Sequence, residues 1–195
     1  MQPRPPWDAA DAGGVHNDPV IELRRAGAPD AAAVADLFLR SFRATYPFPL
    51  AHTDDEVRGW VRDRLVPQLE TWVAVAPASG GDDDSDGEAA PERILGFATI
   101  EPGWLEQLYV DPDHLGEGLG RRLLDLAKQR QPHGLLLWTF QVNARARRFY
   151  ERNGFRLVRL GHEWNNEEHQ PDVQYWWSPT GAAPPELAPP QDPPQ

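Results

Sequence analysis

The 195-residue sequence contains no cysteine, and Lys128 is the only lysine among its 19 basic residues. The absence of cysteine excludes disulfides, thiolate nucleophiles, cysteine-ligated zinc and iron–sulfur clusters. No apolar run approaches the roughly 20 residues that a membrane-spanning helix requires. The first residues also lack the hydrophobic segment of a signal peptide. The lack of cysteine does not fix the compartment, but the lack of a membrane-spanning run and of a signal peptide predicts a soluble, cytoplasmic protein.

The charge balance is acidic, with 30 acidic residues and a formal net charge of −11. Nucleic acids and anionic membranes bind clustered positive charge, so the balance argues against both as partners. Much of the acidity lies in residues 77–93, between two strand-like runs, which predicts a long disordered hairpin loop. A calcium loop is the alternative, although Arg93 stands where such a loop carries a glutamate.

Of the 21 prolines, 11 lie in the two end segments, residues 1–19 and 179–195. Residues 1–19 and 179–195 combine proline with few large apolar side chains, so we expect both to be disordered tails. A ligand for a proline-binding domain is the alternative for the second tail. The remaining residues, 20–178, are enough for one domain.

Hydrophobic periodicity within residues 20–178 predicts both strands and helices. Strands are expected at 20–25, 71–76, 94–102, 104–110, 134–140, 155–160 and 173–177. Helices are expected at 29–45, 53–66, 119–130 and 143–152. This order predicts an α/β fold of three layers (α/β/α), with helices on both faces of a mixed sheet.

A glycine-rich turn precedes the helix at 119–130 and has the sequence Gly116-Glu117-Gly118-Leu119-Gly120. Glycines let backbone N–H groups turn toward a bulky anion, and a helix N-terminus adds about half a positive charge. These features predict a pyrophosphate cradle, and a plain strand–helix connection is the alternative. The turn lacks the lysine of a P-loop and the spacing of a dinucleotide-binding motif.

A second motif lies in the helix at 143–152, where Asn143 and Tyr150 share one face. Together the two motifs resemble the GNAT superfamily of N-acetyltransferases. That family has a strand ending L-Y-V-D-P, then a [Q/R]-x-x-G-x-[G/A] turn, and later an N-x-x-A-x-x-F-Y-E-x-x-G-F helix. The matching residues here are 108–112, Gly118, Gly120, Asn143, Ala146, Phe149, Tyr150, Glu151, Gly154 and Phe155.

The resemblance implies a mostly antiparallel sheet of about six to seven strands with about four helices. It also implies that the strand at 104–110 splays from the strand at 134–140, and that acetyl-CoA binds in this gap as cosubstrate. No metal is expected. The implied cofactor-binding residues are Leu108, Val110, Leu115, Gly116, Glu117, Gly118, Gly120, Arg121, Asn143 and Arg147.

Leu115 stands where the family has Gln or Arg, which removes a contact worth about 1 kcal/mol. Arg121 and Arg122 are candidates to compensate, and a solvated helix face is the alternative for both. For Asn143, capping its own helix is an equal alternative to binding the cosubstrate.

The implied catalytic residue is Tyr150, which would protonate the departing thiolate while the Leu108 N–H stabilises the oxyanion. Strand alternation puts Glu106 on the face of Leu108, so Glu106 is a candidate base for the attacking amine. Glu101 is a second candidate base. A core role for Tyr150 and a surface role for Glu106 are the alternatives.

We therefore expect an N-acetyltransferase that moves acetyl to a primary amine of a small molecule or peptide by direct attack in a ternary complex. A non-catalytic acyl-CoA-binding or interaction module on the same fold is the alternative. Candidate acceptor-binding residues are Phe38, Phe42, Tyr46, Phe48, His52, Glu163, Glu167 and Glu168. The tryptophans at 173–177 make that strand a candidate edge for a homodimer.

Overall fold

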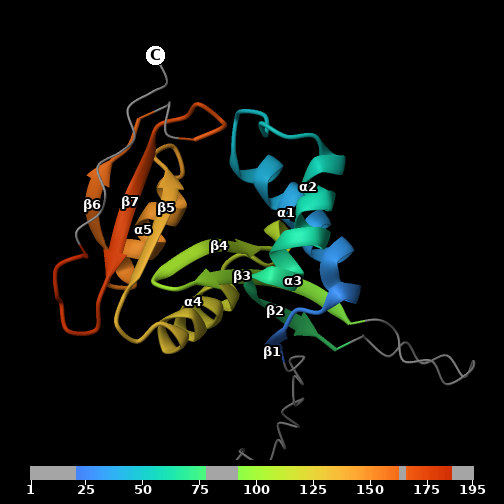
Figure 1. Ribbon diagram of the computed structural model, residues 1–195, viewed down its shortest axis with the longest axis horizontal. Helices are drawn as coiled ribbons and strands as arrows, with labels where there is room; N and C mark the ends of the chain where they lie inside the picture. Colours follow the sequence, from blue (N-terminus) through green and yellow to red (C-terminus); the bar gives the residue numbers. More distant parts are fainter. Residues whose placement is uncertain (1–20, 78–91, 163–165, 186–195) are drawn as a thin grey trace, which may run out of the picture.

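The computed structural model describes residues 21–77, 92–162 and 166–185 (Figure 1). Residues 1–19, most of the acidic segment, Glu163 and the end of the proline-rich segment lie outside the described residues, so the expectations for them stay predictions. Within the described part, no helix is both long and apolar enough to cross a membrane.

The described chain forms seven strands with helices on both faces of one sheet (Figure 1). The strands are β1 Glu22–Arg25, β2 Glu70–Ala76, β3 Arg93–Glu101, β4 Trp104–Val110, β5 Leu135–Phe140, β6 Arg156–Leu160 and β7 Asp172–Trp177. The α-helices are α1 Ala31–Thr45, α2 Asp54–Trp60, α3 Val66–Gln68, α4 Leu119–Arg130 and α5 Ala144–Arg152. The three-layer α/β prediction is confirmed.

The helix expected at 53–66 is divided in the structure. Thr53 caps α2, because its hydroxyl accepts from the Glu56 N–H at 3.3 Å and its own N–H donates to the Glu56 carboxylate at 2.8 Å. The helix then widens into a π-helical turn at Val61–Leu65 before α3. Pro67, which has no N–H to donate, lies just beyond this turn.

The sheet order is β1-β2-β3-β4-β5-β7-β6, and β4 and β5 are its parallel pair. These two strands pair only at Trp104 and Leu136, where the Leu136 N–H donates to the Gly103 carbonyl at 2.8 Å. Beyond that point they diverge (Figure 1). The sheet therefore consists of two half-sheets, β1–β4 and β5–β7–β6, with a gap between them.

The expectation that residues 173–177 form a dimer edge is wrong. The chain returns from β6 to insert β7 between β5 and β6, so β7 has a partner on both sides. Trp176 is 9% exposed, and its indole N–H donates to the Ala182 carbonyl at 2.8 Å. Within the described residues, the outer strand of this half of the sheet is β6, where Leu157 and Leu160 are exposed.

The core lies in two clusters, one on each face of the sheet. Helical spacing places Val34, Leu37, Phe38 and Phe42 of α1 in the first cluster, with the inner residues of α2, β2 and β3. The second cluster contains the buried leucines of α4 together with Tyr150 and Tyr175. Both clusters include residues of β4, which therefore lies between the two helical layers.

A buried carboxylate fixes the end of β4. Asp111 is fully buried and accepts from Arg40 of α1 at 2.9 Å, from Arg93 of β3 at 3.3 Å and from the Asp113 N–H at 3.1 Å. Burial raises the pKa of Asp111, but the Asp113 N–H and the Arg40 guanidinium outweigh it, so the pKa lies below its ordinary value. The turn after β4 is thereby tied to the sheet and to α1.

Candidate active site

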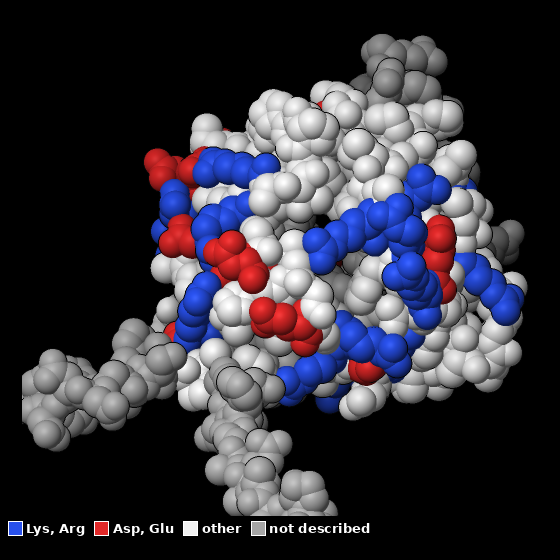
Figure 2. Space-filling view, turned by 180° about the vertical axis from the view of Figure 1, so that it is seen from behind, with Lys and Arg blue, Asp and Glu red and all other residues white. Residues whose placement is uncertain are grey.

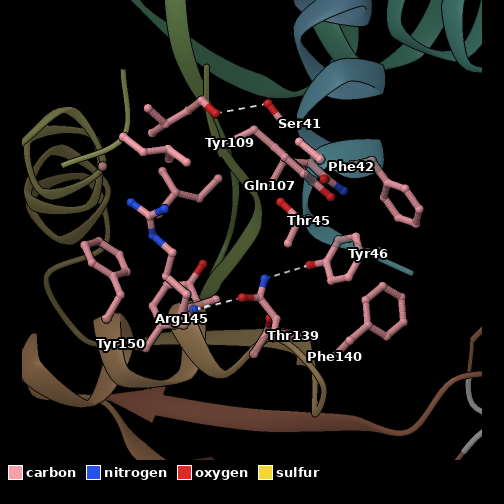
Figure 3. A pocket seen from close by; sticks show the side chains of 18 of the residues that line it. Ser41, Phe42, Thr45, Tyr46, Gln107, Tyr109, Thr139, Phe140, Arg145 and Tyr150 are labelled. Carbon is pink, nitrogen blue, oxygen red and sulfur yellow. Dashed lines mark hydrogen bonds between the residues drawn. The ribbon is translucent and has the colours of Figure 1, made fainter. Parts of the chain in front are cut away.

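A cavity of about 1050 Å³ lies in the gap between the half-sheets. Its walls come from α1, β4, the glycine-rich turn, α4, β5, α5 and the start of β7. Figure 3 shows Ser41, Phe42 and Thr45 of α1 across the cavity from Arg145 and Tyr150 of α5. The cavity exists because β4 and β5 pair at one end only.

The backbone of β4 presents polar groups to this gap. In an antiparallel ladder, hydrogen-bonded and non-hydrogen-bonded pairs alternate. The Asp111 N–H donates to the Leu95 carbonyl at 2.8 Å, so Val110 opposite Gly96 and Leu108 opposite Ala98 are non-hydrogen-bonded pairs. Their peptide groups therefore face away from β3 and toward the gap. The Val110 carbonyl accepts from the Ser41 hydroxyl at 3.0 Å.

The glycine-rich turn has the open geometry that an anion requires. Gly116 and Gly118 have φ of 96° and 84°, in the left-handed region, and Gly118 is the N-cap of α4. A Cβ at either position would meet nothing within 4 Å, so the space beside both belongs to the cavity. At Gly120 a Cβ would lie 3.6 Å from Phe149 and from Val110, because α4 packs closely here.

Two residues expected to bind the cosubstrate have side chains that contact other parts of the protein. Glu117 is absent from the described cavity lining, and its carboxylate pairs with His114 at 3.0 Å. Arg147 is also absent from the lining, because its guanidinium donates to the Tyr175 hydroxyl at 3.4 Å and to the Gln141 carbonyl at 3.3 Å. These partners engage the two side chains only, so a contact of either residue with a bound cosubstrate, including one through the Glu117 backbone N–H, stays a prediction.

Other arginines of α5 line the cavity, whereas Arg147 does not. Arg145, Arg148 and Arg152 line the cavity, and none of them forms an ion pair within the described residues. Arg121 also lines it, but pairs with Asp125 at 2.9 Å. Figure 2 shows basic side chains gathered around a hollow on the α5 side of the molecule. Spacing alone could have found these residues, since 145, 148 and 152 share a helical face.

Asn143 has the capping role that was the alternative. Its Oδ1 accepts from the Ala146 N–H at 2.9 Å, and its Nδ2 donates to the Tyr46 hydroxyl at 3.0 Å (Figure 3). Asn143 also lines the cavity, so a contact with a bound cosubstrate stays a prediction.

Tyr150 lies in the cavity wall and is only 7% exposed. Its ring packs edge-on against Phe149 and Phe155, with centroids 5.3 and 5.5 Å away. Burial raises the pKa of Tyr150 well above its ordinary value, and the neighbouring Tyr46 adds to this effect. The hydroxyl therefore keeps its proton at physiological pH and can donate a hydrogen bond.

Glu106 stands at an irregularity of β4. Thr99 pairs with Gln107 and Ile100 with Leu105, which leaves Glu106 as the extra residue of a β-bulge. The alternation that placed Glu106 on the face of Leu108 is therefore broken. Glu106 still lines the cavity with an exposed side chain, and partial desolvation at the cavity wall, together with the charge of Glu101, raises its pKa. Glu101 is absent from the described lining.

The candidate acceptor-binding residues divide into two groups. Phe38, Phe42, Tyr46 and Glu168 line the cavity. Outside its described lining, Phe48 stacks on Tyr46 with centroids 5.3 Å apart, and His52 pairs with Glu167 at 2.7 Å. Sequence reasoning missed other lining residues, among them Gln107, Tyr109, Trp138, Thr139, Asn166 and Asp172. Across residues 21–77, 92–162 and 166–185, no three His, Asp or Glu side chains could hold a metal ion.

Comparison with known proteins gives consistent results. A family model described as an acetyltransferase (GNAT) domain matches residues 67–157. Streptothricin acetyltransferase from Streptomyces lavendulae is 34% identical, over 71% of this chain and 83% of that protein. The peptidyl-lysine N-acetyltransferase YiaC from Escherichia coli is 29% identical, over 80% of this chain and 95% of that protein. The solution structure of YjaB from Escherichia coli superposes with a TM-score of 0.62 at 25% identity, covering 81% of this chain and 97% of that one.

Proposed function

Because this chain belongs to the GNAT superfamily and is therefore an acyltransferase, we propose that it transfers acetyl from acetyl-CoA to a primary amine. The acceptor is a small molecule or a peptide, it attacks directly in a ternary complex, and the reaction takes place in the cytoplasm. The relatives named for peptidyl-lysine and streptothricin support an amine acceptor. The observation that carries the proposal is the gap between β4 and β5, which joins an anion cradle to a buried tyrosine.

Different residues around the gap can bind different parts of acetyl-CoA. The outward peptide groups of Leu108 and Val110 can pair with the amides of the pantetheine arm, as a further strand would. The backbone N–H groups from Gly116 to Arg121 can hold the pyrophosphate at the N-terminus of α4. The guanidinium groups of Arg145, Arg148 and Arg152, which form no described ion pair, can bind the 3′-phosphate of CoA, because arginine binds phosphate oxygens in a bidentate manner.

The chain's own groups then serve the transfer. Acetyl-CoA supplies an activated acyl group as a thioester. The Leu108 N–H stabilises negative charge on the carbonyl oxygen while the acceptor nitrogen forms its bond to the acyl carbon. Glu106, directly or through water, accepts a proton from that nitrogen. The carbon–sulfur bond breaks, and the Tyr150 hydroxyl donates a proton to the departing thiolate.

The test measures binding and transfer separately. Calorimetry with CoA should show binding that Gly118→Glu abolishes, because a carboxylate would enter the phosphate site, while Gly118→Ala, which shares the strain of the left-handed φ but adds no charge, loses less. Free thiol released from acetyl-CoA should depend on added amine across a mixed amine panel. Absence of CoA binding would overturn the proposal. Binding without amine-dependent thiol release would favour a non-catalytic acyl-CoA-binding module.

A further inference from the structure

The cavity separates its charged side chains by sign. The arginines of its described lining, Arg121, Arg145, Arg148 and Arg152, all belong to α4 and α5. Its carboxylates come from other elements: Glu106 from β4, Glu168 from the segment before β7, and Asp172 from the first residue of β7. Outside the proposed phosphate end, the described lining therefore contains carboxylates and neither arginine nor lysine.

Asp172 is a buried carboxylate whose charge is incompletely compensated. It is 6% exposed, its Oδ2 accepts from Asn166 at 3.1 Å, and its Oδ1 has no hydrogen-bond partner among the described residues. The Asn166 hydrogen bond and the positive charges of Arg159 and His162 lower its pKa, but the Arg159 guanidinium lies over the Trp138 ring at 5.2 Å and forms no described ion pair with Asp172. Burial is the larger effect and raises that pKa. Such a carboxylate gains from a cation that enters its surroundings.

Glu168 is a second carboxylate without a described ion pair, and it is half-buried in the same wall. Its neighbour Glu167 is exposed and pairs with His52 at 2.7 Å. Asn166 closes this segment by donating to the Gln170 carbonyl at 2.7 Å and accepting from its N–H at 3.1 Å. Burial raises the pKa of Tyr46 and the charge of Glu168 adds to this effect, and both residues line the cavity.

An aromatic wall accompanies these carboxylates. Tyr46, Trp138 and Phe140 line the cavity, and the rings of Tyr46 and Phe140 meet edge-to-face with centroids 5.0 Å apart. Aromatic faces bind both methylene chains and cations. This part of the cavity thus combines apolar surface with unpaired negative charge.

We propose that the acceptor carries, besides the amine that is acetylated, a second positively charged group, and that Asp172 and Glu168 bind this group. The substrate class is a diamine, or a lysine-like compound with a second ammonium group. The inference rests on the proposed function for the position of the reacting amine.

The test is a binding comparison on the full chain with CoA present. The probes are cadaverine and pentylamine, which share a five-carbon chain and differ by one ammonium group, and 5-aminovalerate, whose fifth carbon is a carboxylate. We expect cadaverine to bind at least about tenfold more tightly than pentylamine, the effect of one charge-assisted hydrogen bond. Aminovalerate should bind most weakly.

Two variants and one control locate the effect. Glu168→Gln and Asp172→Asn should each reduce the preference for cadaverine at least about threefold while leaving pentylamine affinity unchanged. Glu167→Gln removes the same charge one residue away, outside the described lining, and should keep the preference. Because Asp172 is buried, the thermal midpoint and the CoA affinity of Asp172→Asn show whether this variant folds. If it does not fold, the result for Glu168→Gln decides the inference.

Equal binding of the two amines, or no measurable binding of either, overturns the inference. So does a preference that survives Glu168→Gln and is lost in Glu167→Gln. Thiol release from acetyl-CoA is followed in parallel with the same amines. Cadaverine preference without thiol release supports the second-cation site and counts against the proposed transferase activity, which keeps the two failures distinct.

Discussion

The side-chain amide of Asn143 donates a hydrogen bond to the Tyr46 hydroxyl at 3.0 Å, across 97 positions of sequence. Tyr46 is the C-cap of α1 and Asn143 is the N-cap of α5, so this bond joins the ends of the two helices across the cavity. The Oδ1 of the same amide caps α5. Asn143 is therefore a positioning residue for the wall that carries Tyr150.

We predict that Asn143→Ala destabilises the protein by about 1–2 kcal/mol, because it removes both the cap and the bond to Tyr46. Tyr46→Phe removes only the second contact and should cost about 1 kcal/mol or less. Urea unfolding of both single variants and the double variant measures these free energies. Strict additivity in the double variant would show that the two side chains do not interact energetically.

Tyr150→Phe should lower the rate of acetyl transfer at least about tenfold, which corresponds to roughly 1.4 kcal/mol of barrier. The hydroxyl that provides a hydrogen for sulfur is lost, while the ring and its packing against Phe149 and Phe155 remain. CoA affinity by calorimetry should not change. Turnover equal to that of the wild type would remove Tyr150 from the proposed mechanism.

The double variant Arg145→Gln/Arg148→Gln should weaken CoA binding about tenfold or more, since two unpaired guanidinium groups leave the cavity wall. Dephospho-CoA, which lacks the 3′-phosphate, should bind the double variant and the wild type with similar affinity. Arg64→Gln is the matched control, because Arg64 is exposed and lies outside the described lining. Equal loss for CoA and dephospho-CoA would assign the two arginines to the pyrophosphate instead.

The pH dependence of kcat/KM tests Glu106. A general base acts when deprotonated, so activity should fall as the pH drops through the pKa of Glu106, which partial desolvation and Glu101 raise. Glu101→Gln removes one of these causes, so the acidic limb should move to lower pH. Glu22→Gln, an exposed change on β1, should leave the profile in place. An unshifted limb in Glu101→Gln would point to a different base.

Local signals in the sequence were sufficient for most elements. The bounds of α4 agree with the expected 119–130, because Gly118 ends the preceding turn in a left-handed conformation and apolar residues recur at helical spacing. Asn143 and Gly154 likewise mark the limits of α5 through a cap and a positive φ. These are signals within a few residues of each other.

Signals that depend on distant partners were not readable. Strand order is a property of the whole sheet, so the internal place of β7 could not be inferred from its tryptophans. The bulge at Glu106 depends on the register of β4 with β3, and it breaks the alternation of side chains between the two faces of the strand. Arg147 was expected to bind the cosubstrate, yet its guanidinium donates to the Tyr175 hydroxyl of β7 and to the Gln141 carbonyl of the turn before α5. Asp172 became a site candidate only when its burial was known.

The single backbone pairing between β4 and β5 has a consequence for the cohesion of the protein. A small molecule that fills the seam between two half-sheets acts as a structural component as well as a reactant. Ligand present at a hundredfold excess over its Kd stabilises the folded state by about 2.7 kcal/mol. The durability of this chain in a cell would then follow the supply of its own cosubstrate, so that scarcity of acyl donor shortens the lifetime of the folded enzyme as well as slowing its reaction.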